Sequence, residues 1–355
     1  MPWIEHFRPI QRQVAHSAIA AIRDQPAIPL GTWPTPLDEI DDMTLGRMLV
    51  KRDDRAGFGR LGRSGVKARK LEGFLGFVRD GHYEEVVMPL ANVTNLAFDL
   101  EPVLAALGVR MHLVIADDPP LPAATREAIF REIAPLVHLA GSGKLAVAIH
   151  AVRVAASARL RGRRSLLVMP SPGHPSAVIG AARGFLELVD QLSAAGRPWP
   201  ARLYIAAAAG STAAGFILAS SLLTAAGEQS IEVRAVQVND ENLSLWIPVL
   251  LRWTQRVLRV RGRLLPRYSL IRRKENTRYG RASQAALDTC KRVYSAHGIE
   301  IDPIYGGKVW ATMEQLEHAP HAHSAAPSIV FWHCGYTPDW PAVAGGHGAG
   351  EDLRM

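Results

Sequence analysis

Short apolar runs alternate along the chain with longer stretches in which apolar residues recur every three or four positions. The short runs are rich in Val, Ile and Leu and are bounded by Gly, Pro or charged residues, which indicates buried strands. We predict strands at Arg47–Lys51, Glu85–Met88, Arg110–Ile115, Ser165–Met169, Arg202–Ala207, Ile231–Val238 and Ser328–His333. Strands that alternate with helices form a mostly parallel sheet covered by helices, so the predicted fold class is α/β.

The longer stretches predict helices, and the one that starts at Ser283 illustrates the pattern. Ser283 is suited to cap the start of that helix, and Gly298 is suited to end it. Its expected core-facing residues are Ala286, Cys290, Val293 and Tyr294. The full set of predicted helices is Ile4–Arg23, Lys67–Arg79, Val93–Leu107, Ala123–Ile133, Leu145–Leu160, Ala177–Leu192, Ala213–Ala226, Asn242–Val257, Ser283–His297 and Lys308–Leu316.

Composition places the chain among ordinary globular proteins. It has 355 residues, of which 48% are hydrophobic and 21% charged, enough for about two domains. No apolar run approaches the ~18 residues of a membrane helix, and no secretory signal is visible, so no membrane partner is expected. Two cysteines cannot form a disulfide framework, so a cytoplasmic location is expected. Their spacing to histidines also predicts no metal site.

A net charge of +8 raises the question of nucleic-acid binding. The arginines cluster at 159–164, 252–267 and 272–281, but they are not interleaved with aromatic residues in a basic stripe. No zinc-finger or RNA-recognition signature is present either. We therefore expect no nucleic-acid partner and interpret the charge as a solvated basic surface that also suits small anionic molecules.

The turn Gly210-Ser211-Thr212 is a candidate anion site. It follows a predicted strand directly and opens a helix, so small residues, two hydroxyl groups and a helix N-terminus are available to an anion. The alternative is a plain capped turn between a strand and a helix. The chain contains no Walker A sequence. Its Gly-x-Gly-x-x-Gly match, Gly57–Gly62, neither follows a predicted strand directly nor opens a predicted helix, so the dinucleotide fingerprint is absent, which weakens a nucleotide-dependent transferase as a functional class.

Lys67 is a candidate nucleophile. A lysine in the first turn of a helix is electrostatically disfavoured, and the same field together with burial lowers the pKa of the amine and improves it as a nucleophile towards an aldehyde. The alternative is a solvated lysine beside Arg69 and Lys70.

Four further polar residues lie in predicted turns. Thr94 and Asn95 either cap the helix that follows them or present a hydroxyl and an amide to a carboxylate or phenolate. Tyr279 and Tyr305 stand beside glycines in loops, where tyrosines are often surface residues.

Taken in order, these segments resemble a known family. Thr35-Pro36-Leu37, Lys51-Arg52-Asp53-Asp54 and Gly65-Val66-Lys67-Ala68-Arg69-Lys70-Leu71-Glu72 resemble motifs of the 1-aminocyclopropane-1-carboxylate deaminase and D-cysteine desulfhydrase family. These are pyridoxal 5'-phosphate enzymes of fold type II, the tryptophan-synthase β fold. The matching segments run in order from about residue 35 to 336.

The resemblance implies roles for the candidate residues. Lys67 aligns with the lysine that holds the cofactor as a Schiff base, and Ala209-Gly210-Ser211-Thr212 aligns with the phosphate loop. Asn95 would bond the phenolate oxygen of the cofactor ring, and Thr94 would approach the substrate carboxylate. The remaining aligned residues are Tyr279 and Tyr305, which would shape the pocket, and Cys334, near the ring nitrogen.

The resemblance also implies two open, mostly parallel α/β domains with the cofactor in the cleft between them. Residues 1–69 and 161–337 would form the larger, cofactor-binding domain, and residues 70–160 an inserted smaller one. Residues 338–355 lack periodicity and are expected to form a mobile tail. Family members are usually homodimers.

The expected function is that of a lyase acting on a small amino acid, by β-elimination, deamination or replacement. The chain departs from the family pattern at Val66, Leu96 and Gly306, the last in place of a Glu or Thr. Because Gly306 offers no side chain to the ring nitrogen, elimination or replacement at Cβ is favoured over the opening of an aminocyclopropane ring. The alternative is a non-catalytic or regulatory protein that keeps the fold and binds a small ligand.

Overall fold

The computed structural model describes residues 9–59, 65–90, 95–116, 137–169, 173–276, 281–317 and 328–335, without the side chains of residues 95–98. The contacts within the chain divide it into two compact units. One comprises Met1–Phe74 and His174–Tyr336, and the other comprises Leu75–Gly173 and Thr337–Met355. Helix α3 (Val66–Asp80) begins in the first unit and ends in the second.

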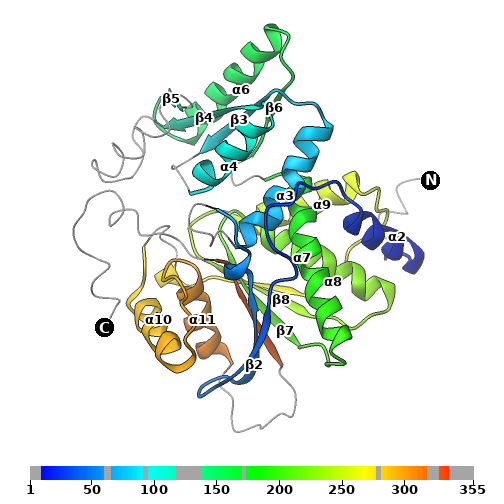
Figure 1. Ribbon diagram of the computed structural model, residues 1–355, viewed down its shortest axis with the longest axis vertical. Helices are drawn as coiled ribbons and strands as arrows, with labels where there is room; N and C mark the ends of the chain where they lie inside the picture. The colour runs from blue at the N-terminus through cyan, green and yellow to red at the C-terminus, as the bar shows by residue number, and fades with distance from the viewer. Residues whose placement is uncertain are drawn as a thin grey trace. The chain divides into compact units, whose positions relative to one another are not determined.

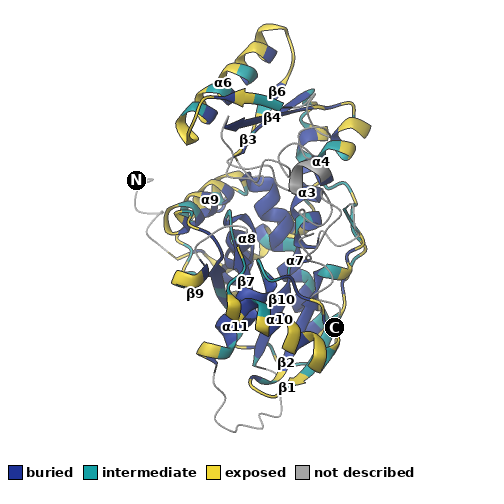
Figure 2. Cartoon of the chain, turned by 90° about the vertical axis from the view of Figure 1, so that its left-hand side faces the viewer, coloured by how far each residue is buried: buried dark blue, intermediate teal, exposed yellow. Residues whose placement is uncertain are grey.

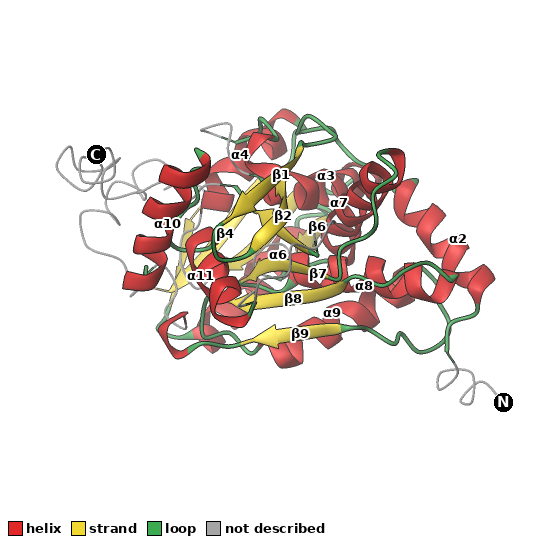
Figure 3. Ribbon diagram, turned by 90° about the horizontal axis from the view of Figure 1, so that it is seen from below, coloured by secondary structure: helices red, strands yellow, loops and turns green. Residues whose placement is uncertain are grey.

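The first unit is built on a six-stranded sheet with the order β1-β2-β10-β7-β8-β9. β1 is antiparallel to β2, and every other neighbouring pair is parallel (Figure 3). The strands are β1 (Leu37–Asp42), β2 (Gly46–Arg52), β7 (Arg202–Ala207), β8 (Glu232–Gln237), β9 (Tyr268–Ile271) and β10 (Ile329–His333). The carboxyl ends of the parallel strands therefore meet along one edge of the sheet, where ligands bind in such folds.

Helices cover both faces of this sheet. Helices α2 (Arg12–Arg23), α7 (Pro175–Ala194), α8 (Ser211–Ala226) and α9 (Leu243–Val257) contribute to the core on one face. Helices α10 (Gln284–His297) and α11 (Gly306–Leu316) contribute to the core on the other. In Figure 1, α7 and α8 lie side by side, and Figure 2 shows that they are buried along most of their length.

The alternation of side chains along β7 explains the two cores. Leu203 and Ile205 face the core with α7 and α8, whereas Tyr204 and Ala206 face the core with α10 and α11. Both faces of a parallel strand are buried in this way, which is why β7 reads as a continuous apolar run in the sequence.

The second unit has a four-stranded, fully parallel sheet with the order β5-β4-β3-β6. Its strands are β3 (Glu85–Leu90), β4 (Arg110–Ala116), β5 (Val137–Ala140) and β6 (Ser165–Leu167). Helix α4 (Asn95–Ala106) packs against β4, and α6 (Lys144–Leu160) packs against the sheet over a small core. That core contains Val87, Val114, Val147 and Ala151.

The predicted α/β class is confirmed, and all seven predicted strands are present within two residues of their expected ends. The structure adds β1, β5 and β9. β1 reads Leu-Asp-Glu-Ile-Asp-Asp and is too acidic to be recognised as a strand, whereas β5 and β9 are four residues long.

Two of the predicted helices differ in part from the structure. Of the predicted helix Ile4–Arg23, residues 4–8 lie outside the described residues, and α2 begins at Arg12 because Pro9 forms a bridge with Arg263 instead of a helical turn. Ser283 caps α10 as predicted, by accepting the Ala286 N–H at 3.3 Å, but Tyr294 is 59% exposed and was wrongly assigned to the core. The predicted helix Ala123–Ile133 and the predicted tail 338–355 lie outside the described residues.

Across the described residues, no helix combines the length and hydrophobicity that crossing a bilayer requires. In that same part of the chain, no group of three or more His, Cys, Asp or Glu side chains is arranged to hold a metal ion.

Candidate active site

The start of α3 is fixed to the end of the central strand β10. The Val66 N–H donates to the Cys334 carbonyl oxygen at 3.1 Å, and Gly65 has a φ of +56°. A Cβ atom on Gly65 would lie 2.1 Å from that same oxygen, so only glycine fits here. The first turn of α3, which carries Lys67, therefore lies at the carboxyl end of β10.

Lys67 and Lys70 lie on one side of α3, because residues three apart are neighbours on a helix surface. Lys70 is buried, and its Nζ is 3.5 Å from Ser211 Oγ at the start of α8. Burial and the positive charge of Lys67 lower the pKa of Lys70 to about 8. The Lys70 amine thus stands beside the turn after β7, and an anion bound there would relieve the cost of its positive charge.

The turn between β7 and α8 has the geometry of an anion cradle. Gly210 has a φ of +81° and occupies the N-cap of α8, whose first turn contains the buried Ser211 and Thr212 and no acidic residue. A Cβ on Gly210 would lie 3.2 Å from Ile247 Cγ1, so α9 packs directly against this turn and leaves little room for a side chain at Gly210. With Lys70 beside it, this turn fits a phosphate group at a helix N-terminus.

Helix α11 begins at the same edge of the sheet. Asp302 is buried, and its carboxylate accepts the backbone N–H groups of Ile304, Tyr305 and Gly306 at 3.0, 2.8 and 3.2 Å. Burial raises the pKa of Asp302. Its carboxylate therefore holds the first turn of α11, where Tyr305 occupies the N-cap position and is half-buried.

Cys334 follows β10 directly and carries a weak hydrogen-bonding group. Its Sγ donates to the Trp332 carbonyl oxygen at 3.6 Å, and burial raises the pKa of the thiol to about 12. The thiol is therefore protonated and neutral at physiological pH.

Glu72 holds the segment Pro26–Pro36 against α3. Its Oε1 accepts the N–H groups of Leu30 and Gly31 at 2.9 and 3.1 Å and the indole N–H of Trp33 at 2.7 Å. The segment is thus bound to α3 about one and a half turns after Lys67, and these hydrogen bonds limit movement of the helix.

A polar pocket of about 340 Å³ lies at the carboxyl ends of β8 and β9. Its lining includes Asn239, Asp240, Arg272 and Arg273. The Asn239 amide also donates to the Ala208 carbonyl oxygen at 3.0 Å, which links the pocket to the turn that precedes α8.

The structure brings several candidate residues to one edge of the first unit. Lys67 is joined to Cys334 through Val66, and to Ser211 through Lys70, while Ala209, Gly210 and Thr212 lie in the same turn as Ser211. Tyr305 lies at the start of α11. Thr94 and Tyr279 lie outside the described residues, and Asn95 begins α4 with its side chain outside them. The roles of all these residues stay predictions.

Lys70 is the residue that the sequence interpretation undervalued. That interpretation assigned it no role beyond being a neighbour of Lys67, but the structure buries it against Ser211. The available signal was its spacing of three residues from Lys67, which places both amines on one helix face.

Comparisons with known proteins give a consistent result. The family model described as "Pyridoxal-phosphate dependent enzyme" matches residues 28–335. Nocardicin C-9' epimerase of Nocardia uniformis is 28% identical over 338 residues, which cover 90% of this chain and 95% of that protein. A provisionally assigned 1-aminocyclopropane-1-carboxylate deaminase of Pyrococcus abyssi is 26% identical over 320 residues, covering 88% and 92% of the two chains.

A solved structure described as an ACC deaminase homologue has the same fold. It superposes with a TM-score of 0.72 at 21% identity and covers 95% of this chain and 98% of its own. Maize serine racemase superposes with a TM-score of 0.57 at 16% identity, covering 94% and 95%.

Proposed function

Because the chain belongs to the family of pyridoxal-phosphate dependent enzymes, we propose that it is a lyase acting on a small amino acid, with Lys67 as the residue that binds the cofactor and moves the substrate proton. Its cofactor is pyridoxal 5'-phosphate, and its fold is that of the fold-type II enzymes. The observation that supports the assignment of Lys67 is its position on the same side of α3 as Lys70, whose amine reaches the start of α8.

The residues of this edge fit the chemical groups of the cofactor. Gly210, Ser211, Thr212 and the Lys70 amine would hold the phosphate, and the Lys67 amine would bond to the aldehyde carbon. When bound, the cofactor supplies an electron sink that makes the Cα proton of an amino acid acidic. The freed Lys67 amine then accepts the proton from Cα and returns it to the departing group or to the product.

The neighbourhood of Gly306 supports a reaction with a good leaving group. Gly306 has no side chain to offer to a ring nitrogen, and the Asp302 carboxylate is occupied by three backbone N–H groups. The Cys334 thiol is neutral and donates only weakly. A site of this kind stabilises little negative charge, so we infer β-elimination or replacement on an amino acid with a leaving group on Cβ, rather than ring opening.

Epimerisation at Cα is the second candidate, favoured by the similarity to nocardicin C-9' epimerase. It needs the same removal of the Cα proton by Lys67, followed by delivery of a solvent-exchangeable proton to the opposite face of Cα by another acid. We further propose that the enzyme is a homodimer, as the resemblance implies, which light scattering of the purified protein tests.

One experiment tests the assignment of Lys67, and a second separates the reactions. Borohydride reduction followed by peptide mapping is expected to place the cofactor on Lys67, and a label on another lysine would contradict the proposal. A panel of D- and L-amino acids in deuterated water is then followed for keto-acid release. Keto acid indicates elimination, whereas Cα deuteration with inversion and no keto acid indicates epimerisation. A colourless protein that binds amino acids without turnover would favour the non-catalytic alternative.

A further inference from the structure

Helix α3 carries two sets of charged side chains on opposite sides. Each residue of a helix is rotated by about 100° about the helix axis relative to the one before it. Lys67 and Lys70 are therefore separated by about 60° around the axis, whereas Arg69 and Glu72 are separated from Lys67 by roughly 160° and 140°. The side with the amines is the one that reaches Ser211. The opposite side is held by its own set of contacts, so these contacts determine how the helix is rotated about its axis.

Arg69 is bound by two carboxylates at once. Its Nε and Nη2 donate to the two oxygens of Asp53 at 2.8 and 2.7 Å, and its Nη1 and Nη2 donate to the two oxygens of Glu187 at 2.9 Å each. The side chains of Arg69 and Asp53 are 4% and 0% exposed. Two bidentate pairs on one guanidinium fix its plane as well as its position.

The surrounding polar groups complete a neutral, buried cluster. Trp332 donates its indole N–H to Asp53 at 2.8 Å, and Lys51 donates to Glu187 at 2.5 Å. The cluster therefore contains two cations and two anions, and it joins η1 (Asp53–Arg55), α3, α7 and strands β2 and β10. Because a buried cluster of this kind is costly to desolvate, its benefit lies in specifying one arrangement of the elements it joins.

Glycines bring the backbone of α3 into direct contact with α7. A Cβ on Gly180 would lie 2.1 Å from the Arg69 carbonyl oxygen, and one on Gly184 would lie 2.5 Å from Arg69 Cδ. A Cβ on Gly73 would lie 2.5 Å from the Ser176 carbonyl oxygen. The two helices thus touch along their backbones, and Arg69 passes through this contact to reach Glu187 on α7.

We propose that Arg69 is a positioning residue: its double fork with Asp53 and Glu187 sets the rotation of α3 and thereby the direction of the Lys67 amine on the opposite side. This inference rests on the proposed function, in which Lys67 binds the cofactor. A change in rotation moves the amine relative to the turn at Gly210, and displacements of about 1 Å cost roughly 100-fold in rate.

The test uses Arg69→Lys, which keeps the charge but replaces a planar fork by a single point charge. The matched control is Arg23→Lys. Arg23 also forms a two-bond pair with a carboxylate on α7, at 2.6 and 2.8 Å to Asp190, but that pair is exposed and far from α3 in sequence. For both variants we would measure the pH midpoint of the cofactor's near-visible absorbance, cofactor affinity, kcat and the thermal midpoint.

We expect Arg69→Lys to shift the absorbance midpoint by at least half a pH unit and to lower kcat about 10- to 100-fold, with the assay run below its thermal midpoint. Cofactor affinity should fall as well, because the Lys70 amine lies on the same side of α3 and moves with the Lys67 amine. Arg23→Lys should leave all of these unchanged. A folded Arg69→Lys protein with the wild-type absorbance midpoint and kcat would overturn the inference and leave only a structural role.

If Arg69→Lys does not fold, Glu187→Gln replaces it in the test. This variant retains the shape of the side chain and removes the bidentate ion pair between Arg69 and Glu187. The same shift in the absorbance midpoint is expected, and its absence overturns the inference. Borohydride mapping of the unmodified enzyme separates the two proposals. A label on Lys67 with unaffected variants contradicts only the positioning role, whereas a label elsewhere contradicts the proposed function and the positioning role together.

Discussion

Gly65 and Cys334 touch so closely that the backbone oxygen of Cys334 occupies the space where a side chain on Gly65 would begin. The distance from a Cβ to that oxygen would be 2.1 Å, and the next residue, Val66, donates its N–H to the same oxygen. The contact holds the first turn of α3 against the end of β10 and so fixes the distance of the Lys67 backbone from the carboxyl edge of the sheet.

Gly65→Ala should displace the first turn of α3 and reduce both cofactor retention and activity by at least tenfold. The matched control is Gly46→Ala, because Gly46 also has a positive φ, +68°, but a Cβ there meets nothing within 4 Å. The control carries only the backbone strain of about 1–2 kcal/mol and should keep its cofactor affinity. Equal effects of the two substitutions on cofactor binding would show that the contact with Cys334 is unimportant.

Gly210→Ala should weaken cofactor binding because the residue has a φ of +81° and a Cβ there would lie 3.2 Å from Ile247 Cγ1. Gly227→Ala is the control at the other end of α8, with a φ of +92° and a comparable 3.3 Å approach, to Arg12 Cζ. Both variants should lose stability, but only Gly210→Ala should lose cofactor affinity in equilibrium dialysis. A Gly210→Ala protein that retains the cofactor as tightly as Gly227→Ala would remove this turn from the proposed phosphate site.

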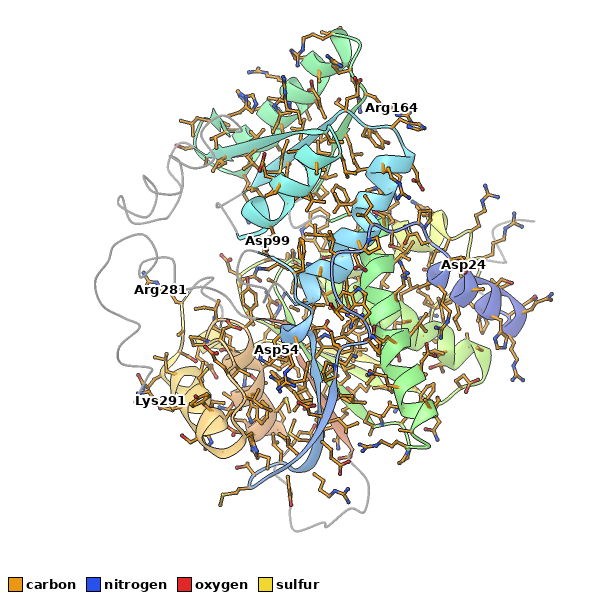
Figure 4. All side chains as sticks on the ribbon, in the orientation of Figure 1. Asp24, Asp54, Asp99, Arg164, Arg281 and Lys291 are labelled. Atoms are coloured by element: carbon orange, nitrogen blue, oxygen red, sulfur yellow. The ribbon has the colours of Figure 1, made fainter. Side chains whose placement is uncertain are left out.

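Lys70→Met should weaken cofactor binding about 10- to 100-fold, the loss expected for one hydrogen bond to a charged group of ~1.5–3 kcal/mol. Lys291→Met is the control, since Lys291 is an exposed lysine on α10, labelled in Figure 4. Titration of each cofactor-free protein with pyridoxal 5'-phosphate gives the comparison. Unchanged affinity in Lys70→Met would mean that the amine near Ser211 does not contact the phosphate.

The stability of the cofactor-free protein should rise between about pH 8 and pH 10.5 through Lys70. Its pKa is lowered from 10.5 to about 8 by burial and by Lys67, so in this range the folded state binds fewer protons than the unfolded state. Stability rises with pH wherever the unfolded state binds more protons, and the penalty of burying the charge is fully present below pH 8.

Urea unfolding at pH 7.5 and 9.5, for the wild type and Lys70→Met, measures this contribution. Lys308 has a pKa lowered to about 8 by burial and titrates in both proteins, so the difference between the two slopes reports Lys70. The wild type should gain more stability with rising pH than the variant. Parallel slopes would show that Lys70 is not desolvated in the cofactor-free protein.

Local patterns predicted the regular elements well because those elements bury apolar residues at regular spacing. β7 and β10 are examples, each with an unbroken or nearly unbroken apolar run. β1 was missed because its residues are mostly acidic and its place at the sheet edge leaves them partly exposed. Local sequence carries no information about such a strand, because its partner β2 decides that it forms.

The residues of the candidate site could be predicted from the sequence only in part, for a similar reason. Periodicity placed Lys67 at a helix start and Gly210 at a turn, but the resemblance to a family supplied the link between them. Lys70 gains its burial from Ser211, which lies 141 residues later in the chain. Arg69 gains its two partners from Asp53 and Glu187, which lie 16 residues before it and 118 residues after it.

The position of β10 has a consequence for the order of events during synthesis. This strand comprises residues 329–333, yet it lies between β2 and β7 in the middle of the sheet. A nascent chain that has reached residue 320 contains Lys67, Lys70 and the turn at Gly210, but it lacks the strand that joins the two halves of the sheet and the oxygen of Cys334 that seats α3. Such long-range closure is slow and leaves strand edges exposed until it happens. Assembly of the cofactor site is therefore expected to follow completion of the sheet, and a message truncated shortly before codon 329 should yield an aggregation-prone product rather than a partly active enzyme.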